Sequence, residues 1–318
     1  MLSRRAALAA PLLLPALARA QAPWPDRPIR IIVAFPAGSV TDTLHRNLAE
    51  PLSRELGVPV IIENRAGGNG VVGTEAGARA APDGHTWTVL STTNGALNTY
   101  TVRRLPYDPL RDFASIGYVA DNPYVLAVKA DHPAKDLAGL IEMAKREPGK
   151  LTYSTGNSSS HIASATLASM AGVEMTNIPY RGGPEALTDV MAGRIDSTFT
   201  DIPAGLAQQR EGRIRLLAST YPTEFSLLPG VPPVSSVLPG YGFVFWFGMV
   251  APAATPQPII ARANAAMNKV LAEPAIVAKL AGLGYMPGPG EPGKFTETLR
   301  QQIPWLVERA KAAGIEAQ

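Results

Sequence analysis

The amino-acid sequence predicts an α/β protein built of two lobes. Short runs rich in β-branched and aromatic residues alternate with amphipathic segments, a pattern typical of strand–helix–strand units and of a mainly parallel sheet. The alternation occurs in two successive series, and only helical segments follow the second series. An alternative interpretation of the same pattern is one large doubly wound domain.

The first series begins with the apolar run IRIIVAF, which we expect to form a strand. A loop and an amphipathic segment, TDTLHRNLAEPLSREL, follow this strand. The predicted strands of the series are 29–35, 58–64 and 85–91, and its predicted helices are 41–56 and 70–81.

The second series begins near Ala114. Its predicted strands are 114–120, 124–130, 150–155, 175–180, 194–201 and 213–220, and its predicted helices are 135–147, 161–172, 184–193 and 203–212. The apolar run 242–251 comes next. Two closing helices, 256–271 and 294–313, are expected to pack back on the first lobe.

Two lobes formed in this order require the chain to cross between them twice, near residues 120–125 and 246–250. We therefore predict a two-strand hinge, with lobe 1 formed by 23–122 and 249–318 and lobe 2 by 123–248. Ligands of hinged two-lobed proteins bind in the cleft between the lobes.

The first 22 residues have the pattern of an export signal. Arg4 and Arg5 form a basic region, residues 6–18 are weakly apolar, and Ala18-Arg19-Ala20 fits the cleavage pattern of signal peptidase. The apolar stretch is shorter than the roughly 20 residues of a membrane span, so we expect a periplasmic chain without membrane insertion. The run SRRAAL fits a twin-arginine signal, and an ordinary Sec signal is the alternative.

Composition excludes several kinds of partner. The chain has 29 Lys and Arg and 26 Asp and Glu. Without the three arginines of the leader, 26 basic residues balance 26 acidic ones, and no basic cluster with interleaved aromatics predicts nucleic-acid binding. Because cysteine is absent and the four histidines are scattered, we expect no disulfide, no metal and no other cofactor.

The segment AGGNGVVGTEAGARA contains the spacing G-x-G-x-x-G at Gly68, Gly70 and Gly73, the outline of a dinucleotide-binding loop. Such a loop follows the first strand of its domain, and an acidic residue closes the next strand. Here the loop follows the second predicted strand, and the next one ends in Ser and Thr. We therefore interpret the glycines as a tight turn, with Gly73 and Gly77 allowing the helix to approach the sheet closely.

Several motifs occur in a fixed order along the chain: WPDRPIR, AFPAGSVTD, VIIENRAGGNGVVG and AAPDGHT, then LTYSTGNSSSHIA, IPYRGGPEALTDVMAGRIDSTFTD and FWFGMVAPAATP. Their combination resembles the extracytoplasmic Bug-type receptors of tripartite tricarboxylate transporters over nearly the whole mature chain. The resemblance implies a type II periplasmic-binding-protein (Venus-flytrap) fold. It also implies reversible capture of a small carboxylated metabolite, without chemistry, for integral-membrane transporter subunits.

The chain departs from this family pattern in three places. Ser39 replaces the second glycine of the family's G-G-x-x-D, and His85 replaces an aromatic residue after P-D-G. The run GNSSSH takes the place of a loop that is often richer in glycine. The side chain of Ser39 would narrow the pocket and add a hydrogen-bond donor.

Two strand-to-helix loops are the candidate binding loops. In AFPAGSVTD, small residues at a helix N-terminus suit a carboxylate, and we interpret Asp42 as a helix-terminal charge. In STGNSSSH, neutral hydroxyls and amides can bind a ligand or act only as caps. The candidate ligand-binding residues are Phe35, Gly38, Ser39, Thr41, Thr93, Asn94, Gly156, Asn157, Ser158, Ser159, His161, Arg181 and Asp201.

Other roles remain open for some of these side chains. Arg181 can pair with a ligand carboxylate or form a salt bridge, and Asp201 can select a ligand ammonium or hydroxyl or cap a helix. Trp246 and Phe247 are interpreted as hydrophobic core.

The sequence favours a monomeric receptor over an enzyme. It contains neither the G-x-S-x-G turn of hydrolases nor H-E-x-x-H, and His161 beside the serines is the one candidate base. A periplasmic hydrolase and a ligand sensor for a membrane kinase are the alternatives. Di- and tricarboxylates, amino acids and aromatic acids all remain candidate ligands.

Overall fold

Strand β1 (Ile29–Val33) lies inside the sheet of the first lobe, and four of its five side chains are buried. The computed structural model describes residues 24–317, so the predicted export signal lies outside the described residues. The strand order of this sheet is β11-β4-β10-β3-β1-β2. Its other strands are β2 (Val60–Asn64), β3 (Thr86–Ser91), β4 (Phe113–Asp121), β10 (Trp246–Pro252) and β11 (Met286–Pro287).

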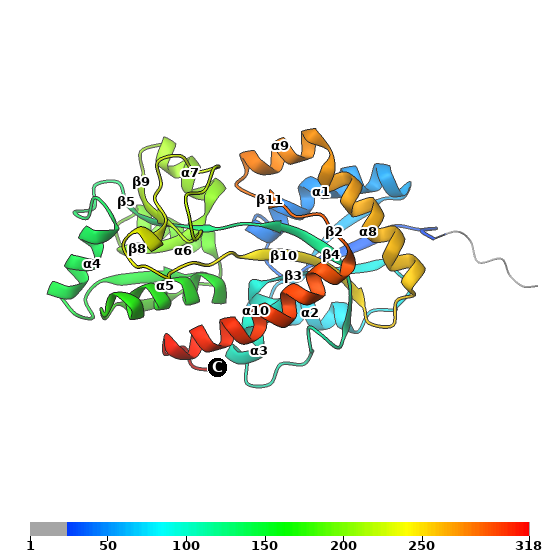
Figure 1. Cartoon of the computed structure of the whole chain (residues 1–318), viewed down its shortest axis with the longest axis horizontal. Coiled ribbons are helices and arrows are strands. Elements are labelled where there is room, and N and C mark those ends of the chain that lie inside the picture. The colour runs from blue at the N-terminus through cyan, green and yellow to red at the C-terminus, as the bar shows by residue number, and fades with distance from the viewer. Residues whose placement is uncertain (1–23, 318) are drawn as a thin grey trace, which may run out of the picture.

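The helices of the first lobe cover both faces of this sheet (Figure 1). Helix α1 forms because Leu44, Leu48 and Leu52 recur at helical spacing and are fully buried against the strands. The helices are α1 (Val40–Leu56), α2 (Val71–Ala78), α8 (Gln257–Ala272) and α9 (Pro274–Gly282), with short turns η1 (Gly68–Gly70), η2 (Thr93–Leu97) and α3 (Asn98–Thr101).

The second lobe contains a separate five-stranded sheet with the order β7-β6-β8-β5-β9. Its strands are β5 (Tyr124–Lys129), β6 (Thr152–Thr155), β7 (Thr176–Pro179), β8 (Ser197–Asp201) and β9 (Ile214–Ser219). Its helices are α4 (Leu137–Arg146), α5 (Ser158–Ala171), α6 (Gly183–Met191) and α7 (Ile202–Arg210), and a short turn η3 (Val234–Ser236) follows β9.

Two chain segments connect the lobes, as Figure 1 shows. The chain passes from β4 to β5 through residues 122 and 123, and it returns after β9 to begin β10 at Trp246. The two segments lie side by side, since the amide of Asn122 donates to the carbonyl of Phe245 at 2.8 Å. The predicted two-lobed α/β fold with a two-strand hinge is therefore confirmed.

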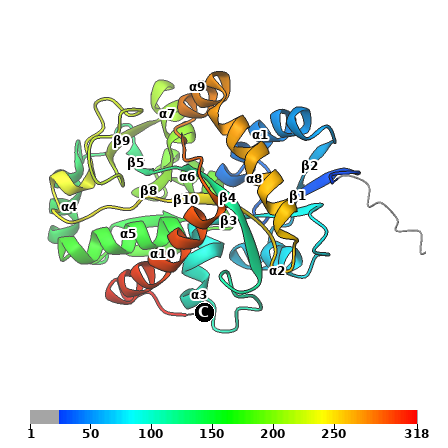
Figure 2. The same cartoon turned by 45° about the vertical axis from the view of Figure 1, so that its right-hand side comes forward.

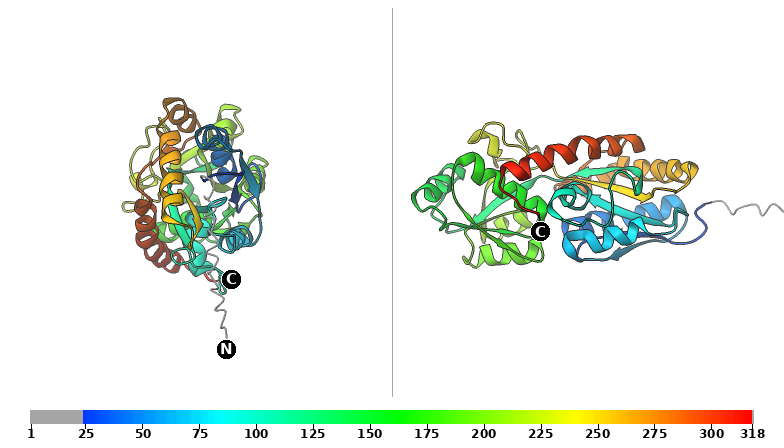
Figure 3. Two further views of the ribbon diagram at one scale, coloured as in Figure 1. Left: turned by 90° about the vertical axis from the view of Figure 1, so that its right-hand side faces the viewer. Right: turned by 90° about the horizontal axis from the view of Figure 1, so that it is seen from below.

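The last helix, α10 (Pro292–Ala312), packs against both lobes. It lies along β4 in the first lobe and beside α5 in the second (Figures 2 and 3). At its second-lobe end the ring of Trp305 packs against Phe243, with 5.5 Å between ring centroids.

One expectation about the elements is wrong, and two short elements were not predicted. Both sheets are mixed rather than mainly parallel, because β10 runs antiparallel to β3 and β4, and β5 runs antiparallel to β8 and β9. Strand β4 opens the second predicted series, lies within the predicted lobe 1 (23–122) and pairs in the first sheet. Helix α9 and strand β11 were not predicted, since short segments carry too few residues for a clear periodicity.

Candidate functional site

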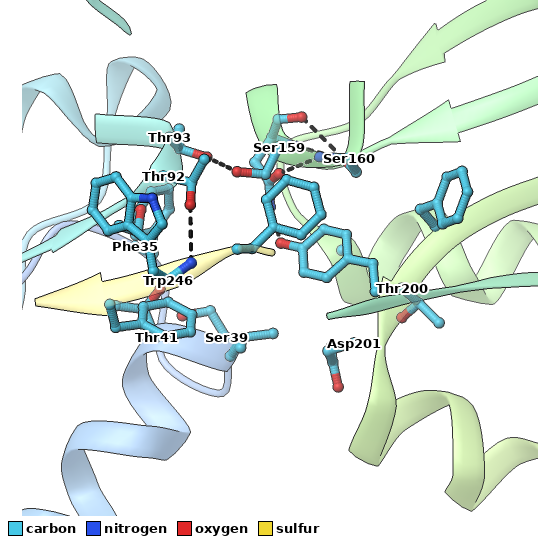
Figure 4. A pocket seen from close by; sticks show the side chains of 18 of the residues that line it. Phe35, Ser39, Thr41, Thr92, Thr93, Ser159, Ser160, Thr200, Asp201 and Trp246 are labelled. Atoms are coloured by element: carbon cyan, nitrogen blue, oxygen red, sulfur yellow. Dashed lines mark hydrogen bonds between the residues drawn. The ribbon is translucent and has the colours of Figure 1, made fainter. Parts of the chain in front are cut away.

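A cleft between the lobes lies where the carboxyl ends of several strands meet the first turns of α1, α5 and α6 (Figure 4). It contains about 660 Å³ of space not filled by protein atoms, part of it open to solvent. The lining residues are Phe35, Gly38, Ser39, Val40, Thr41, Ser91, Thr92, Thr93, Tyr124, Asn157, Ser159, Ser160, Gly183, Pro184, Phe199, Thr200, Asp201, Phe245, Trp246 and Phe247.

The first-lobe wall of the cleft is the N-terminus of α1. Ser39 caps the helix, and its Oγ accepts the amide of Asp42 at 3.3 Å. The hydroxyl of Tyr285 donates to the carbonyl of Val40 at 2.8 Å and holds this turn against β11. Within the described residues, the amides of Val40 and Thr41 donate to no acceptor, as expected for the first positions of a helix.

Asp42 holds the same turn from behind. Its carboxylate accepts hydrogen bonds from the amide of Gly38, from Nε of Arg46 and from Nδ2 of Asn64, each at 2.8 Å. Burial acts to raise the pKa of Asp42, but these bonds outweigh it and hold the pKa below its usual range. Asp42 therefore stays ionised and structural.

The second-lobe wall is the N-terminus of α5. The side chain of Asn157 accepts the amide of Ser160 at 2.8 Å, and the hydroxyl of Ser160 accepts the amides of Gly156 and Asn157 at 3.1 and 3.3 Å. This capping leaves the amides of Ser158 and Ser159 without an acceptor among the described residues. The serines therefore begin the helix rather than form a loop before it.

Aromatic side chains close the cleft between these two walls. The ring of Tyr124 packs on Phe245 with 4.6 Å between centroids, and burial raises the pKa of Tyr124 to about 12, which keeps its hydroxyl neutral. Trp246 and Phe247 are nearly fully buried, as core residues are, yet they also line the cleft. Sequence reasoning did not identify Tyr124, Phe245, Trp246 and Phe247 as lining residues. They line the cleft because they lie beside the two connecting segments, at the start of β5 and around the start of β10.

The lobes touch each other through two side-chain pairs. Thr93 Oγ1 lies 2.9 Å from Ser159 Oγ, and Nδ2 of Asn69 donates to Ser158 Oγ. Both pairs join a first-lobe residue to the first turn of α5, so the two lobes are in direct contact beside the cleft; Figure 4 shows the Thr93–Ser159 pair.

The predicted site residues divide between this cleft and a second interlobe hollow beside it. The cleft is lined by Phe35, Gly38, Ser39, Thr41, Thr93, Asn157, Ser159 and Asp201. The second hollow is lined by Gly156, Ser158, His161 and Arg181, and it also reaches Phe35 and Asn157.

The structure places Asn94 outside both. Its side chain is fully buried; Oδ1 accepts from Ser91, and Nδ2 donates to Thr74 Oγ1 at 2.7 Å and to the carbonyl of Val89 at 3.0 Å. The chain after β3 forms a π-helical turn (Thr93–Leu97) rather than an open loop, and this turn buries Asn94. The hydrogen bonds of its side chain hold the turn in place.

His161 is not arranged as the base of a serine nucleophile. Its Nε2 lies 3.4 Å from Nδ2 of Asn177, and no serine hydroxyl hydrogen-bonds its ring in residues 24–317. Over the same residues, no group of three His, Cys, Asp or Glu side chains could hold a metal ion. None of the described helices is both long enough and apolar enough to cross a membrane.

Comparison with known sequences gives a family match. The profile described as "Tripartite tricarboxylate transporter family receptor" matches residues 44–300. The chain is 34% identical over 283 residues to the UPF0065 protein in the tcbD-tcbE intergenic region of Pseudomonas sp. (strain P51), covering 88% of this chain and 84% of that one. It is 32% identical over 268 residues to protein BugT of Bordetella pertussis, covering 83% and 82%.

Solved structures of similar fold agree with this match. The R. palustris protein Rpa4515 with adipate superimposes with a TM-score of 0.89 at 31% identity, over 93% of this chain and 100% of that one. Periplasmic binding protein BugD gives a TM-score of 0.86 at 29% identity, over 93% and 100%. MatC from Rhodopseudomonas palustris with bound malate gives 0.84 at 26% identity, over 90% and 99%.

Proposed function

The chain belongs to the tripartite tricarboxylate transporter receptor family, of the Bug type, and from this premise we propose how it works. It captures a small carboxylate in the cleft between its lobes, without chemistry, and delivers it to the membrane subunits of a transporter. The working protein is a periplasmic monomer from which the first 22 residues have been removed.

One observation carries the proposal for the binding mode. The N-termini of α1 and α5, from opposite lobes, present free amide groups at one cleft. Helix N-termini bind anions through these amides and through the helix dipole. The adipate and malate held by the relatives Rpa4515 and MatC support a carboxylate as the anion.

The binding residues we propose are those of the predicted set that line the cleft, together with Tyr124 and Trp246. Only the closed state brings both helix N-termini to one ligand, so binding shifts the population of the protein toward that state. The proposal keeps the predicted lobes, lobe 1 formed by 23–122 and 249–318 and lobe 2 by 123–248.

Calorimetric titration with di- and tricarboxylates, amino acids and aromatic acids tests the proposal. The protein is first unfolded and refolded to release any bound ligand. The variant Thr41→Val removes a hydroxyl that belongs to the cleft lining and has no hydrogen bond to another described residue. For an acid that binds the unchanged protein, we expect the Kd of this variant to be about five-fold higher.

The matched control is Thr43→Val, two residues along the same helix and outside the cleft lining. It should bind as the unchanged protein does. Failure of every acid to bind the refolded protein would refute carboxylate capture, and equal losses in the two variants would refute the assignment of Thr41.

A further inference from the structure

Asp201 is the only Asp, Glu, Lys, Arg or His among the described residues that line the cleft. It ends β8, where it pairs in register with Tyr124 of β5, and it caps α7. Figure 4 shows it on the second-lobe side of the cleft, opposite Ser39 and Thr41 of the first lobe. The cleft of a carboxylate receptor therefore carries one acidic side chain of its own.

The carboxylate of Asp201 has acceptor capacity left over. Its Oδ1 accepts the amide of Ala204 at 2.9 Å. No side chain of residues 24–317 donates a hydrogen bond to it, and no ion pair involves it. Since a carboxylate can accept about four hydrogen bonds, the oxygen atoms of Asp201 can still receive a donor from the cleft.

The surroundings of Asp201 favour binding of a ligand that supplies such a donor. Burial raises the pKa of Asp201, because few groups solvate its charge. Among residues 24–317, no cationic side chain lines the cleft to compensate it. A plain dicarboxylate adds only negative charge and acceptors beside Asp201, whereas a hydroxyl or ammonium group of a ligand supplies the missing donor.

We propose that the ligand is a hydroxy- or amino-substituted carboxylate, held by the helix N-termini through its carboxylate and by Asp201 through its hydroxyl or ammonium group. This inference rests on the proposed function and narrows its substrate class. Asp201 is then a specificity-determining residue, in addition to its role as the cap of α7.

Matched ligand series test the inference. The refolded protein is titrated with succinate, malate and aspartate, then with glutarate, 2-hydroxyglutarate and glutamate, and with propionate, lactate and alanine. Within the series that binds, we expect the hydroxy or the amino member to bind at least about ten-fold more tightly than the unsubstituted acid.

Two variants assign this preference to Asp201. Asp201→Ala should reduce it to less than about two-fold. Asp201→Asn keeps an acceptor oxygen and a good helix cap, so it should preserve a preference for a hydroxyl and remove one for an ammonium. Asp136→Ala is the control, because Asp136 caps α4 in the same way, accepting the amide of Gly139 at 2.7 Å, and does not line the cleft.

The outcomes separate this inference from the proposed function. If an unsubstituted acid binds as tightly as its substituted relatives, the inference fails and the carboxylate receptor stands. A preference that survives Asp201→Ala refutes the role of Asp201. If no acid of any series binds, the proposed function fails, and the inference fails with it.

Discussion

His45 lies directly behind the wall of the cleft, on the buried face of α1. Its side chain is fully buried, and its ring packs edge-on against Phe247 with 6.4 Å between centroids. Nδ1 lies 2.7 Å from the carbonyl of Thr41. Because a carbonyl only accepts hydrogen bonds, we assign the ring proton to Nδ1. Nε2 has no partner among the described residues. The ring is therefore buried in its neutral form.

This burial predicts a pH dependence of stability. Burial lowers the pKa of His45 from 6.5 to about 4, so between these values the unfolded chain binds a proton that the folded chain does not. The stabilisation is complete above pH 6.5 and decreases as the pH falls toward 4. The total loss is about 3 kcal/mol. Urea unfolding at a series of pH values between 4 and 7 measures it.

Two variants control this prediction, and in each the slope of the free energy of unfolding against pH is measured. His45→Gln should flatten the slope whatever its own cost in stability. His161→Gln should retain most of it, because His161 is only partly buried. Equal slopes in the unchanged protein and in His45→Gln would contradict the assignment.

Two glycines of α2, Gly73 and Gly77, lie so close to neighbouring residues that a side chain would not fit. A Cβ atom at Gly73 would lie 2.6 Å from the carbonyl oxygen of Arg65 and 2.8 Å from Cα of Ala34. A Cβ atom at Gly77 would overlap Thr88 of β3. These contacts explain a run that resembles a dinucleotide-binding fingerprint, since only glycine lets α2 lie this close to the sheet.

We therefore expect Gly77→Ala to lower the free energy of unfolding by about 1–3 kcal/mol, because α2 or Thr88 must move. The matched control is Gly282→Ala at the end of α9, where the added methyl group meets no other described atom within 4 Å beyond its chain neighbours and the adjacent helix backbone. The control should be neutral or stabilised by up to about 1 kcal/mol. Urea unfolding at neutral pH compares the two, and an unchanged stability for Gly77→Ala would disprove the packing role.

The two lobes are held together by contacts that do not depend on a ligand. Asn69 is the only non-glycine residue with positive φ among residues 24–317, at φ 54°. This conformation points its side chain from the glycine-rich loop across to Ser158. Together with the Thr93–Ser159 pair, this contact stabilises the closed arrangement of the lobes.

Removing the contact should favour the open state. Ser158→Ala and Asn69→Gly each delete one partner, and glycine accepts the positive φ without strain. We expect each to raise the Kd of a bound carboxylate by up to about five-fold, as the loss of one hydrogen bond predicts. The radius of gyration of the ligand-free protein, measured by small-angle scattering, should increase.

A double-variant cycle checks the coupling. If the two residues act through one contact, the combined variant should bind no more weakly than either single variant. Additive losses would contradict a shared contact, and an unchanged radius of gyration in both variants would contradict its role in closure.

Most elements were predictable because their signal is local. The run IRIIVAF and the spacing of Leu44, Leu48 and Leu52 predict β1 and α1 directly. Strand direction was not predictable, since an antiparallel hinge strand such as β10 has the same apolar run as a parallel one. The short strand β11 exists only through its pairing with β4.

The site was predictable in part for the same reason. The strand-to-helix loops that contain Ser39 and Ser159 predict helix N-termini, and both of these residues line the cleft. Asn94 carries an equally polar side chain, but its neighbours in space bury it. Sequence reasoning interprets Trp246 as a core residue and predicts Tyr124 only as the start of a strand. Apolar character does not show which buried face borders a cavity.

Local sequence therefore determined the helices, most of the strands and the positions of the two helix N-termini that we propose as the anion site, since each depends on residues close together in the chain. Tertiary structure decided what depends on residues far apart. It set the strand directions, the contact of α10 with both lobes and the position of Asp201 opposite α1. It also excluded Asn94 and enclosed the cleft with aromatic rings. Pairings between residues that lie on different lobes leave no periodic mark on either segment, and only the folded chain brings them together.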